Sequence, residues 1–142
     1  MSDLLYRKEL LRLAGDAHGA GRLNHPKITG EAHNAVCGDK ITVDLRLENG
    51  RVAAIAVEAK ACVLTQASAS ILGQNAKGLT REDTARLRRA VVEMLEHGGL
   101  PPNTPFEAFS AFDGAIAYPT RHQCVLLPID AVLNAFDRSE AG

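Results

Sequence analysis

One segment of the chain alternates apolar and polar residues so strictly that it specifies a β-hairpin. From Ile41 to Leu47 the odd-numbered positions are apolar and the even-numbered positions are polar, which is the pattern of a half-buried strand. Asn49 and Gly50 follow, and this dipeptide tolerates the positive φ angles of a tight hairpin turn. Residues 51–58 supply the partner strand, so an antiparallel sheet is predicted.

Outside the hairpin, apolar residues recur at helical spacing in four stretches. These stretches are residues 6–17, 63–77, 80–97 and 121–136. Thr80 and Asp83 resemble a capping box at the start of the third stretch. Pro128 lies inside the fourth, so that helix is expected to kink there or to begin there. Helices beside an antiparallel sheet indicate an α+β fold.

Two other regions are assigned from composition. Residues 18–36 are expected to form a loop, because they contain Pro26, Gly30 and scattered polar side chains. Phe106, Phe109 and Phe112 follow a proline-rich connector, and their predicted role is packing against the core.

Length and charge exclude several classes of protein. The chain has 142 residues, which predicts one domain over 1–142. Its net charge is −1, which argues against phosphate neutralisation on a nucleic acid. No apolar run approaches the roughly 18 residues of a membrane helix, and the charged N-terminus does not resemble a signal peptide. We expect a cytoplasmic protein with no nucleic-acid or membrane partner.

The number and spacing of the cysteines limit the roles that their thiols can have. Three cysteines cannot form a closed set of disulfides, and in a reducing compartment thiols are buried, catalytic or metal-bound. Cys37, Cys62 and Cys124 are far apart in the sequence, so a zinc ribbon built from local pairs is excluded. Any site that they share must be assembled by the fold.

The predicted hairpin brings two of these cysteines to one end of the sheet. Cys37, Gly38 and Asp39 precede its first strand, and Cys62 follows its second. Cys62 also precedes a predicted helix, whose N-terminus favours a thiolate, and Cys124 lies near the start of the last helix. Three thiolates and one carboxylate suit Zn²⁺ or an iron–sulfur centre. The alternative is three unrelated core thiols that bind no metal.

Three segments in this order resemble the U-type iron–sulfur cluster assembly scaffolds, which comprise IscU, SufU and the N-terminal domain of NifU. The segments read NAVCGDKI from residue 34, CVLTQASAS from residue 62 and RHQC from residue 121. The resemblance extends from about Tyr6 to Phe136. It implies a small antiparallel sheet of about three strands packed against several helices.

The resemblance also implies a function. Family members accept sulfur from a cysteine desulfurase, here one of the SufS type, and pass a transient [2Fe–2S] or [4Fe–4S] cluster to apo iron–sulfur proteins. Carried over, the ligands of the cluster, or of Zn²⁺ at the same site, are Cys37, Asp39, Cys62 and Cys124. The sulfur acceptor is Cys37 if the chain follows the SufU branch and Cys124 if it follows the IscU branch.

Residues near the ligands favour the SufU branch. Arg121 matches that branch, whereas Gln123 stands where IscU proteins have histidine. Ala61 replaces a glycine that is usual in the family, and a positive φ angle there would strain alanine. Lys60 is a candidate to pair with a thiolate and lower its pKa, and Gly38 permits a sharp turn beside the ligands.

Three functions remain open at this point. The first is a scaffold that builds and transfers a cluster, which acts as a sulfur acceptor rather than as an enzyme. The second is a zinc-dependent sulfurtransferase that acts with a desulfurase without building a cluster. The third is a structural module stabilised by zinc.

Overall fold

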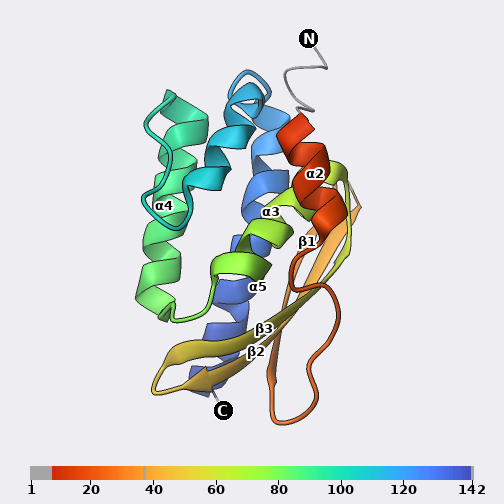
Figure 1. Ribbon diagram of the computed structural model, residues 1–142, viewed down its shortest axis with the longest axis vertical. Coiled ribbons are helices and arrows are strands. Elements are labelled where there is room, and N and C mark those ends of the chain that lie inside the picture. Colours follow the sequence, from red (N-terminus) through yellow and green to blue (C-terminus); the bar gives the residue numbers. More distant parts are fainter. Residues whose placement is uncertain (1–7, 37, 142) are drawn as a thin grey trace.

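The structure, a computed structural model, describes residues 8–36 and 38–141. Three strands and a set of α and 3-10 helices follow one another along the chain (Figure 1). In order they are α2 (Lys8–Asp16), β1 (Ile28–Asn34), β2 (Asp39–Glu48), β3 (Arg51–Lys60), α3 (Val63–Asn75), α4 (Arg81–His97), η1 (Glu107–Ala115), η2 (Pro119–Arg121) and α5 (His122–Ala141). The predicted α+β fold is confirmed.

The sheet is antiparallel with strand order β1-β2-β3. The β2–β3 hairpin lies where the alternation predicted it, and Asn49 and Gly50 form its turn with φ angles of 54° and 77°. Two consecutive positive φ angles match the right-handed twist of the paired strands. A register shift between Arg46 and Leu47 bends the hairpin before the turn.

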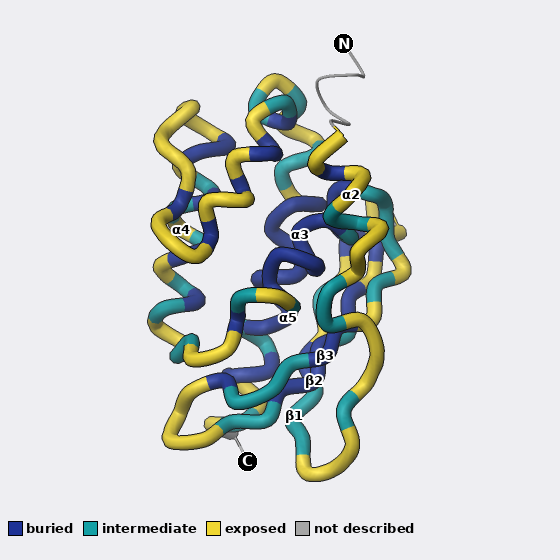
Figure 2. Tube along the Cα trace, viewed as in Figure 1, coloured by how far each residue is buried: buried dark blue, intermediate teal, exposed yellow. Residues whose placement is uncertain are grey.

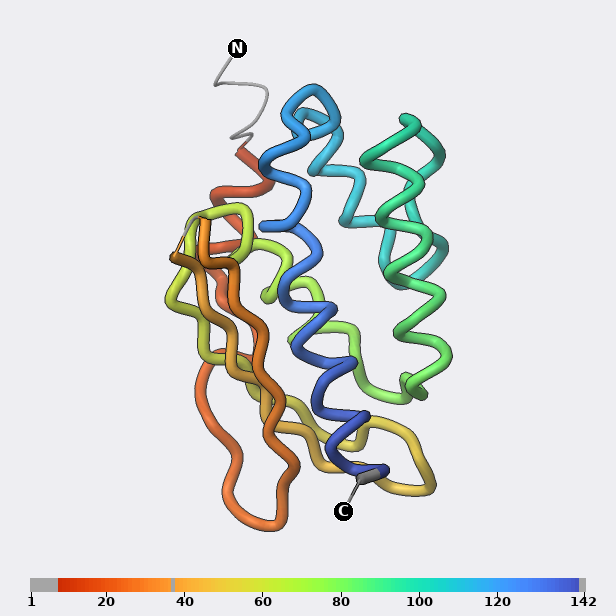
Figure 3. Tube along the Cα trace, turned by 180° about the vertical axis from the view of Figure 1, so that it is seen from behind, coloured from red at the N-terminus to blue at the C-terminus, as the bar shows by residue number. Residues whose placement is uncertain are grey.

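One face of the sheet is covered by helices. Ile41, Val43 and Leu45 point from β2 into the core and are fully buried. Seen from behind, α5 lies between the sheet and α4 (Figure 3). Helix α3 packs against α5 and α2 and is buried along most of its length (Figure 2). The first turns of α3 and α5 therefore meet at one end of the sheet.

The loop predicted for residues 18–36 is partly wrong, because β1 lies within it. The strand reads ITGEAHN, which lacks the alternation that reveals β2. This strand packs closely against the backbone of α5. A Cβ at Gly30 would lie 2.4 Å from the Ala131 carbonyl oxygen and 2.4 Å from the Ala135 nitrogen. Glycine permits this approach, so packing rather than propensity explains the strand.

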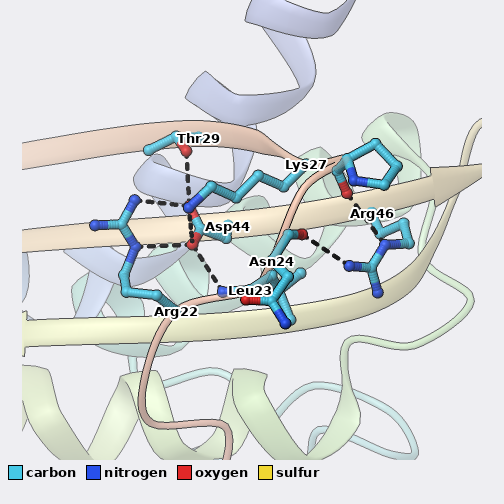
Figure 4. Close-up of polar contacts among 8 residues, drawn as sticks. Arg22, Leu23, Asn24, Lys27, Thr29, Asp44 and Arg46 are labelled. Atoms are coloured by element: carbon cyan, nitrogen blue, oxygen red, sulfur yellow. Dashed lines mark hydrogen bonds and ion pairs between the residues drawn. The ribbon is translucent and has the colours of Figure 1, made fainter.

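A buried carboxylate holds the segment before β1 against the outer face of the sheet (Figure 4). Asp44 is fully buried and accepts hydrogen bonds from the side chains of Arg22, Lys27 and Thr29 and from the Leu23 amide. Burial alone raises the pKa of the Asp44 carboxyl. The hydrogen bonds outweigh burial and hold that pKa well below its usual range.

The helix boundaries agree with most of the sequence signals. The capping box of Thr80 and Asp83 opens α4 as predicted. Helix α5 does not begin at Pro128, which was one of the two alternatives, because it begins at His122 and runs through the proline to Ala141. The three phenylalanines expected in the core, Phe106, Phe109 and Phe112, are buried in and beside η1. None of the helices in the described ranges has the length and apolar character needed to cross a bilayer.

Other segments hydrogen-bond to both outer strands of the sheet. On β1, the Glu31 amide donates to the Asn134 side chain at 2.9 Å, and Arg138 donates to the Thr29 carbonyl at 2.8 Å. On β3, the Val57 amide donates to the Gly19 carbonyl at 2.7 Å. The sheet is therefore held at its edges by α5 and by the segment after α2.

Candidate metal centre

Three potential ligands from three separate elements meet at this end of the sheet. Asp39 begins β2, Cys62 lies two residues after the end of β3, and Cys124 lies in the first turn of α5. One donor atom from each lies within 4.8 Å of the others. Asp39 and Cys124 are buried and Cys62 is half-buried. The predicted return of the hairpin explains the first pair, because Lys40 and Lys60 face each other in the β2–β3 register.

Cys37 lies outside the described residues, so its position relative to this cluster is not assigned. The residues on either side of it form a turn between β1 and β2. The Gly38 amide donates to the Asn34 carbonyl at 2.8 Å, and Gly38 has a φ angle of 73°. This left-handed conformation favours glycine, which explains the glycine between Cys37 and Asp39.

Asp39 is tied to the start of α3. Cys62 is the N-cap residue of that helix but provides no side-chain cap. Instead, the Cys62 amide donates a hydrogen bond of 3.1 Å to Oδ1 of Asp39. A carboxylate beside a helix N-terminus is stabilised by the amides there and by the helix dipole. Asp39 is thus held beside Cys62 by the backbone itself.

The environment of Cys62 favours its thiolate. A hydrogen bond with Cys124 lowers the pKa of the Cys62 thiol most, burial opposes it, and Thr65 lowers it further. The nearby charge of Asp39 raises it slightly, and the resulting pKa is about 6. The lowered pKa favours the thiolate of Cys62, which is the form that binds a soft metal ion.

Thr65, in the first turn of α3, contacts all three ligand residues and is itself fully buried. Its hydroxyl oxygen lies 3.0 Å from Oδ2 of Asp39, 3.0 Å from the carbonyl oxygen of Cys124 and 3.5 Å from Sγ of Cys62. One turn further along, Ser68 donates to the Val125 carbonyl at 2.6 Å. These two hydroxyls join α3 to α5 next to the cluster.

The arrangement matches a known family. The model of the NifU-like N-terminal domain matches residues 5–124 of the chain. The chain belongs to this family. Relatives include the zinc-dependent sulfurtransferase SufU of Bacillus subtilis, 25% identical over 140 residues that cover 99% of this chain and 95% of the relative. The iron–sulfur cluster assembly scaffold protein IscU of Thermotoga maritima is 27% identical over 124 residues, 87% of each chain.

Solved structures agree with this assignment. The N-terminal NifU-like protein of Brucella abortus is 34% identical and superposes with a TM-score of 0.92 over 99% of this chain and 97% of its own. A scaffold protein of the SUF system from Fervidobacterium islandicum, 21% identical, superposes at 0.79 over 96% of this chain and 99% of its own and shows the same fold. The resemblance inferred from the three segments is confirmed.

One departure from the family pattern has no structural cost. Ala61 stands where a glycine is usual, and strain was expected if that position needs a positive φ angle. Within the described ranges, Ala17 and Asn49 alone among non-glycine residues have positive φ. The Ala61 backbone is therefore unstrained, and its carbonyl accepts a hydrogen bond of 2.7 Å from the Gln66 side chain.

The two supporting side chains suggested by the sequence lie at the margins of the cluster. Lys60 ends β3 with an exposed side chain and lines a small pocket on the sheet with Lys40, Thr42 and Glu58. The groups that set the pKa of Cys62 are Cys124, Thr65 and Asp39. Arg121 ends η2 and is half-buried just before α5.

The sequence pattern predicts no role for Thr65. The available signal was a hydroxyl three residues after Cys62, in the first turn of a predicted helix. Side chains at that position can bond back toward the residue before the helix. The contacts with Asp39 and Cys124 depend on tertiary packing and have no local signal.

The donor set fits the zinc and iron–sulfur centres that appear in the names of the relatives. Two thiols and a carboxylate, two of the three buried, are the ligand types of Zn²⁺ and of thiolate-bound iron–sulfur centres. Zinc prefers four ligands, so three leave one position for another donor. The described residues therefore supply most of a tetrahedral site.

Proposed function

We propose that this chain is an iron–sulfur cluster assembly protein that accepts sulfur from a cysteine desulfurase and delivers it, as a cluster, to apo iron–sulfur proteins. The observation that carries the proposal is the convergence of Asp39, Cys62 and Cys124 within 4.8 Å from three elements. Cys37, two residues before Asp39, is proposed as the fourth ligand. The same four residues would hold Zn²⁺ or a [2Fe–2S] or [4Fe–4S] cluster.

The mixed set of thiol and carboxylate ligands supports a metal centre that is transferred to another protein rather than retained. Thiolates bind iron and zinc strongly, whereas a carboxylate is a harder and weaker ligand for such soft sites. Both carboxylate oxygens of Asp39 have hydrogen-bond donors within the protein. It can therefore leave a metal without becoming an unpaired buried charge.

Sulfur transfer to this chain would use one of its thiolates. The thiolate attacks the outer sulfur of the desulfurase persulfide, a new S–S bond forms, the old S–S bond breaks, and the desulfurase cysteine leaves as a thiolate. We propose Cys37 as the acceptor, with Cys124 as the alternative. The complete burial of Cys124 supports this order, because a partner's persulfide cannot reach a buried sulfur without local opening.

A second candidate, a zinc-dependent sulfurtransferase that builds no cluster, is favoured by one comparison. The match to the Bacillus subtilis protein of that name covers 99% of this chain. In that case bound Zn²⁺ would keep the cysteines ionised and in place until sulfur arrives. The scaffold is favoured by the match to the Thermotoga maritima IscU over 87% of the chain.

Metal content and sulfur loading would separate these functions. We would purify the full chain without added metal, measure zinc and iron per chain, and incubate it with a SufS-type desulfurase, cysteine and ferrous iron. A scaffold is expected to develop thiolate-to-iron absorption and to activate an apo iron–sulfur protein. Stoichiometric zinc, faster desulfurase turnover and no cluster absorption would instead establish the sulfurtransferase.

The sulfur acceptor is identified in the same reaction. Mass spectrometry after alkylation would detect persulfide on the native chain, and single Cys37→Ser, Cys62→Ser and Cys124→Ser variants serve as matched controls. Loss of the persulfide in Cys37→Ser alone is expected. Zinc that binds without any persulfide on any cysteine would leave only a structural zinc module.

We also propose that residues 1–142 form a single domain, which predicts one cooperative unfolding transition.

A further inference from the structure

A row of basic side chains crosses all three strands at the end of the sheet where the candidate metal centre lies. His33, Lys40 and Lys60 are neighbours in the β1–β2 and β2–β3 registers, so their side chains share one face of the sheet. That face is the outer one, because Ile41, the next residue along β2, is buried in the core. All three basic residues are exposed. This basic row therefore borders the turn between β1 and β2.

Contacts within the chain leave the two lysines largely unneutralised. Nζ of Lys40 lies 3.7 Å from a Glu31 carboxylate oxygen, but both side chains are about half exposed, so this ion pair contributes little. Lys60 faces Lys40 directly across the ladder, where like charges repel. Glu58 and Thr42 line a cavity of about 60 Å³ with them. Among the described residues, no carboxylate lies within 4.0 Å of the Lys60 amine.

Cations further along the same face are neutralised inside the protein. Arg22 and Lys27 approach the buried carboxylate of Asp44 at 2.7 and 3.2 Å (Figure 4). Their segment covers Asp44 and stops short of the cavity between the two facing lysines, which residues of β2 and β3 alone line. Unneutralised positive charge on the outer face is therefore placed beside the metal centre.

An apolar side chain is held outward on the turn that adjoins the basic row. Val36 is 93% exposed. Asn34 shapes this turn, because its side-chain oxygen accepts from the Val36 amide at 3.2 Å and its carbonyl accepts from the Gly38 amide at 2.8 Å. Single exposed apolar residues are common, but this one directly precedes Cys37, the proposed sulfur acceptor, and comes three residues after His33. An apolar tip bordered by positive charge has the composition of a docking surface.

We propose that the basic row and Val36 form the docking surface for the desulfurase, and that they recognise carboxylates beside the persulfide of that enzyme. The inference rests on the proposed sulfur-accepting function. The protein that delivers sulfur must approach the cysteines at this end of the sheet. Its carboxylates would neutralise Lys40 and Lys60, and attraction between opposite charges would speed and orient the encounter. Val36 would then enter an apolar recess of the partner.

Reversal of one charge tests the electrostatic part. Lys60→Glu should slow association of the full chain with a SufS-type desulfurase about fivefold at low salt, and the difference should nearly vanish at about 0.5 M salt. Lys60→Arg should associate at the native rate. Lys77→Glu is the matched control, because Lys77 is also exposed and adjoins Gly78, which hydrogen-bonds to Val52 beside the hairpin turn at the opposite end of the sheet. It makes the same change in net charge and should associate at the native rate.

The apolar part has a different signature. Val36→Ser should raise the dissociation rate several-fold at both salt concentrations, because apolar contacts are not screened by salt. Leu100→Ser is the matched control, because Leu100 is 89% exposed in the connector after α4. It should dissociate at the native rate. Stopped-flow fluorescence with a labelled desulfurase measures both rates.

Cross-linking tests the chemistry of the partner without any substitution. A water-soluble carbodiimide joins a lysine amine to a carboxylate that it touches. In the native complex we expect Lys40 and Lys60, but not Lys77, to be joined to aspartate or glutamate residues of the desulfurase. The same reaction with an apo iron–sulfur protein is the comparison. Cross-links from these two lysines to the apo protein and none to the desulfurase would assign the surface to cluster delivery and overturn the proposal.

The outcomes separate this proposal from the proposed function. If the native chain neither binds the desulfurase nor receives sulfur from it, the sulfur-accepting function fails. If it does both, then native association by Lys60→Glu, or an equal loss in Lys77→Glu, overturns the docking surface. Zinc content and melting temperature of Lys60→Glu should match the native chain. If they do not, the cross-links of the native chain decide the question.

Discussion

The Cys62 amide donates a hydrogen bond of 3.1 Å to Oδ1 of Asp39, so a candidate metal ligand also caps the helix that carries another ligand. The two roles use different properties of one side chain. Capping needs an oxygen acceptor, whereas metal binding is favoured by the negative charge. Substitutions that separate acceptor from charge therefore distinguish the structural role from the metal-binding role.

Asp39→Asn keeps an acceptor oxygen and removes the charge, and Asp39→Ala removes both. We expect the free energy of unfolding of the apo protein to fall by about 1–2 kcal/mol in Asp39→Ala, the cost of a lost cap, and by less in Asp39→Asn. Zinc affinity should fall in both. Denaturant unfolding and competition with a chelator measure these quantities, and native zinc affinity in Asp39→Ala would show that Asp39 is no ligand.

Asp44→Ala removes the acceptor shared by Arg22, Lys27, Thr29 and the Leu23 amide. The side chain of Lys27 is 15% exposed, so loss of its partner leaves a largely buried charge. We expect the free energy of unfolding to fall by about 3 kcal/mol. This is the low end of the range for a broken buried ion pair, because the side chain of Arg22 is 42% exposed. Zinc content should stay native, because the cluster lies elsewhere. Arg81→Ala, which breaks an exposed pair with Asp137, is the control and should cost under about 1 kcal/mol.

The lowered pKa of Asp44 also predicts a pH dependence. On acidification the unfolded chain protonates this carboxyl near pH ~4, whereas the folded chain keeps it ionised to lower pH. The stability that Asp44 contributes is present above that unfolded pKa and is lost as the pH falls below it. Unfolding free energies from pH 5 to 2 should therefore decline more steeply for the native chain than for Asp44→Asn. Parallel curves would contradict this.

Gly30→Ala tests the contact between β1 and α5. The added methyl would meet the Ala131 carbonyl oxygen and the Ala135 nitrogen at 2.4 Å, so backbone must shift. We expect destabilisation of about 2–3 kcal/mol by thermal or denaturant unfolding. Gly15→Ala is the control, because Gly15 lies in α2 with no atom within 4 Å of an added Cβ. It should be neutral or slightly stabilising.

Ala61→Gly restores the usual family residue. Because the Ala61 backbone has no positive φ angle, glycine relieves no strain and adds freedom to the unfolded chain. We expect unchanged zinc affinity and a loss of about 0.5–1 kcal/mol in stability. A gain in stability would show that the alanine is strained after all.

The sequence was sufficient for the elements with local signals. The alternation from Ile41 to Leu47 and the Asn49-Gly50 turn predict the hairpin, and the hairpin alone explains why Asp39 and Cys62 meet. Strand β1 lacks such a signal, because Gly30 is selected by the approach of α5 rather than by strand propensity. The contacts of Thr65 are also non-local, since one of them joins it to a carbonyl 59 residues away.

Pro128 shows why one of the two alternatives expected there, a helix that begins at the proline, was wrong. A proline inside a helical pattern usually marks a kink or a boundary, yet α5 continues through it. The carbonyl of Cys124 accepts a hydrogen bond from Thr65 on a neighbouring helix, and this bond reduces the cost of the amide that proline lacks. Such compensation requires α3 to be in place, which no window of residues around Pro128 reveals.

The hydrogen bonds along the outer strands protect the sheet edges against association with other molecules. Exposed strand edges invite further strands from other molecules, which is a route to fibrils and to strand-addition complexes. Here Asn134 and Arg138 occupy part of the β1 edge, and Gly19 occupies part of the β3 edge. An incoming strand would first have to displace these bonds. Strand addition at either edge is therefore opposed by bonds that the chain itself supplies.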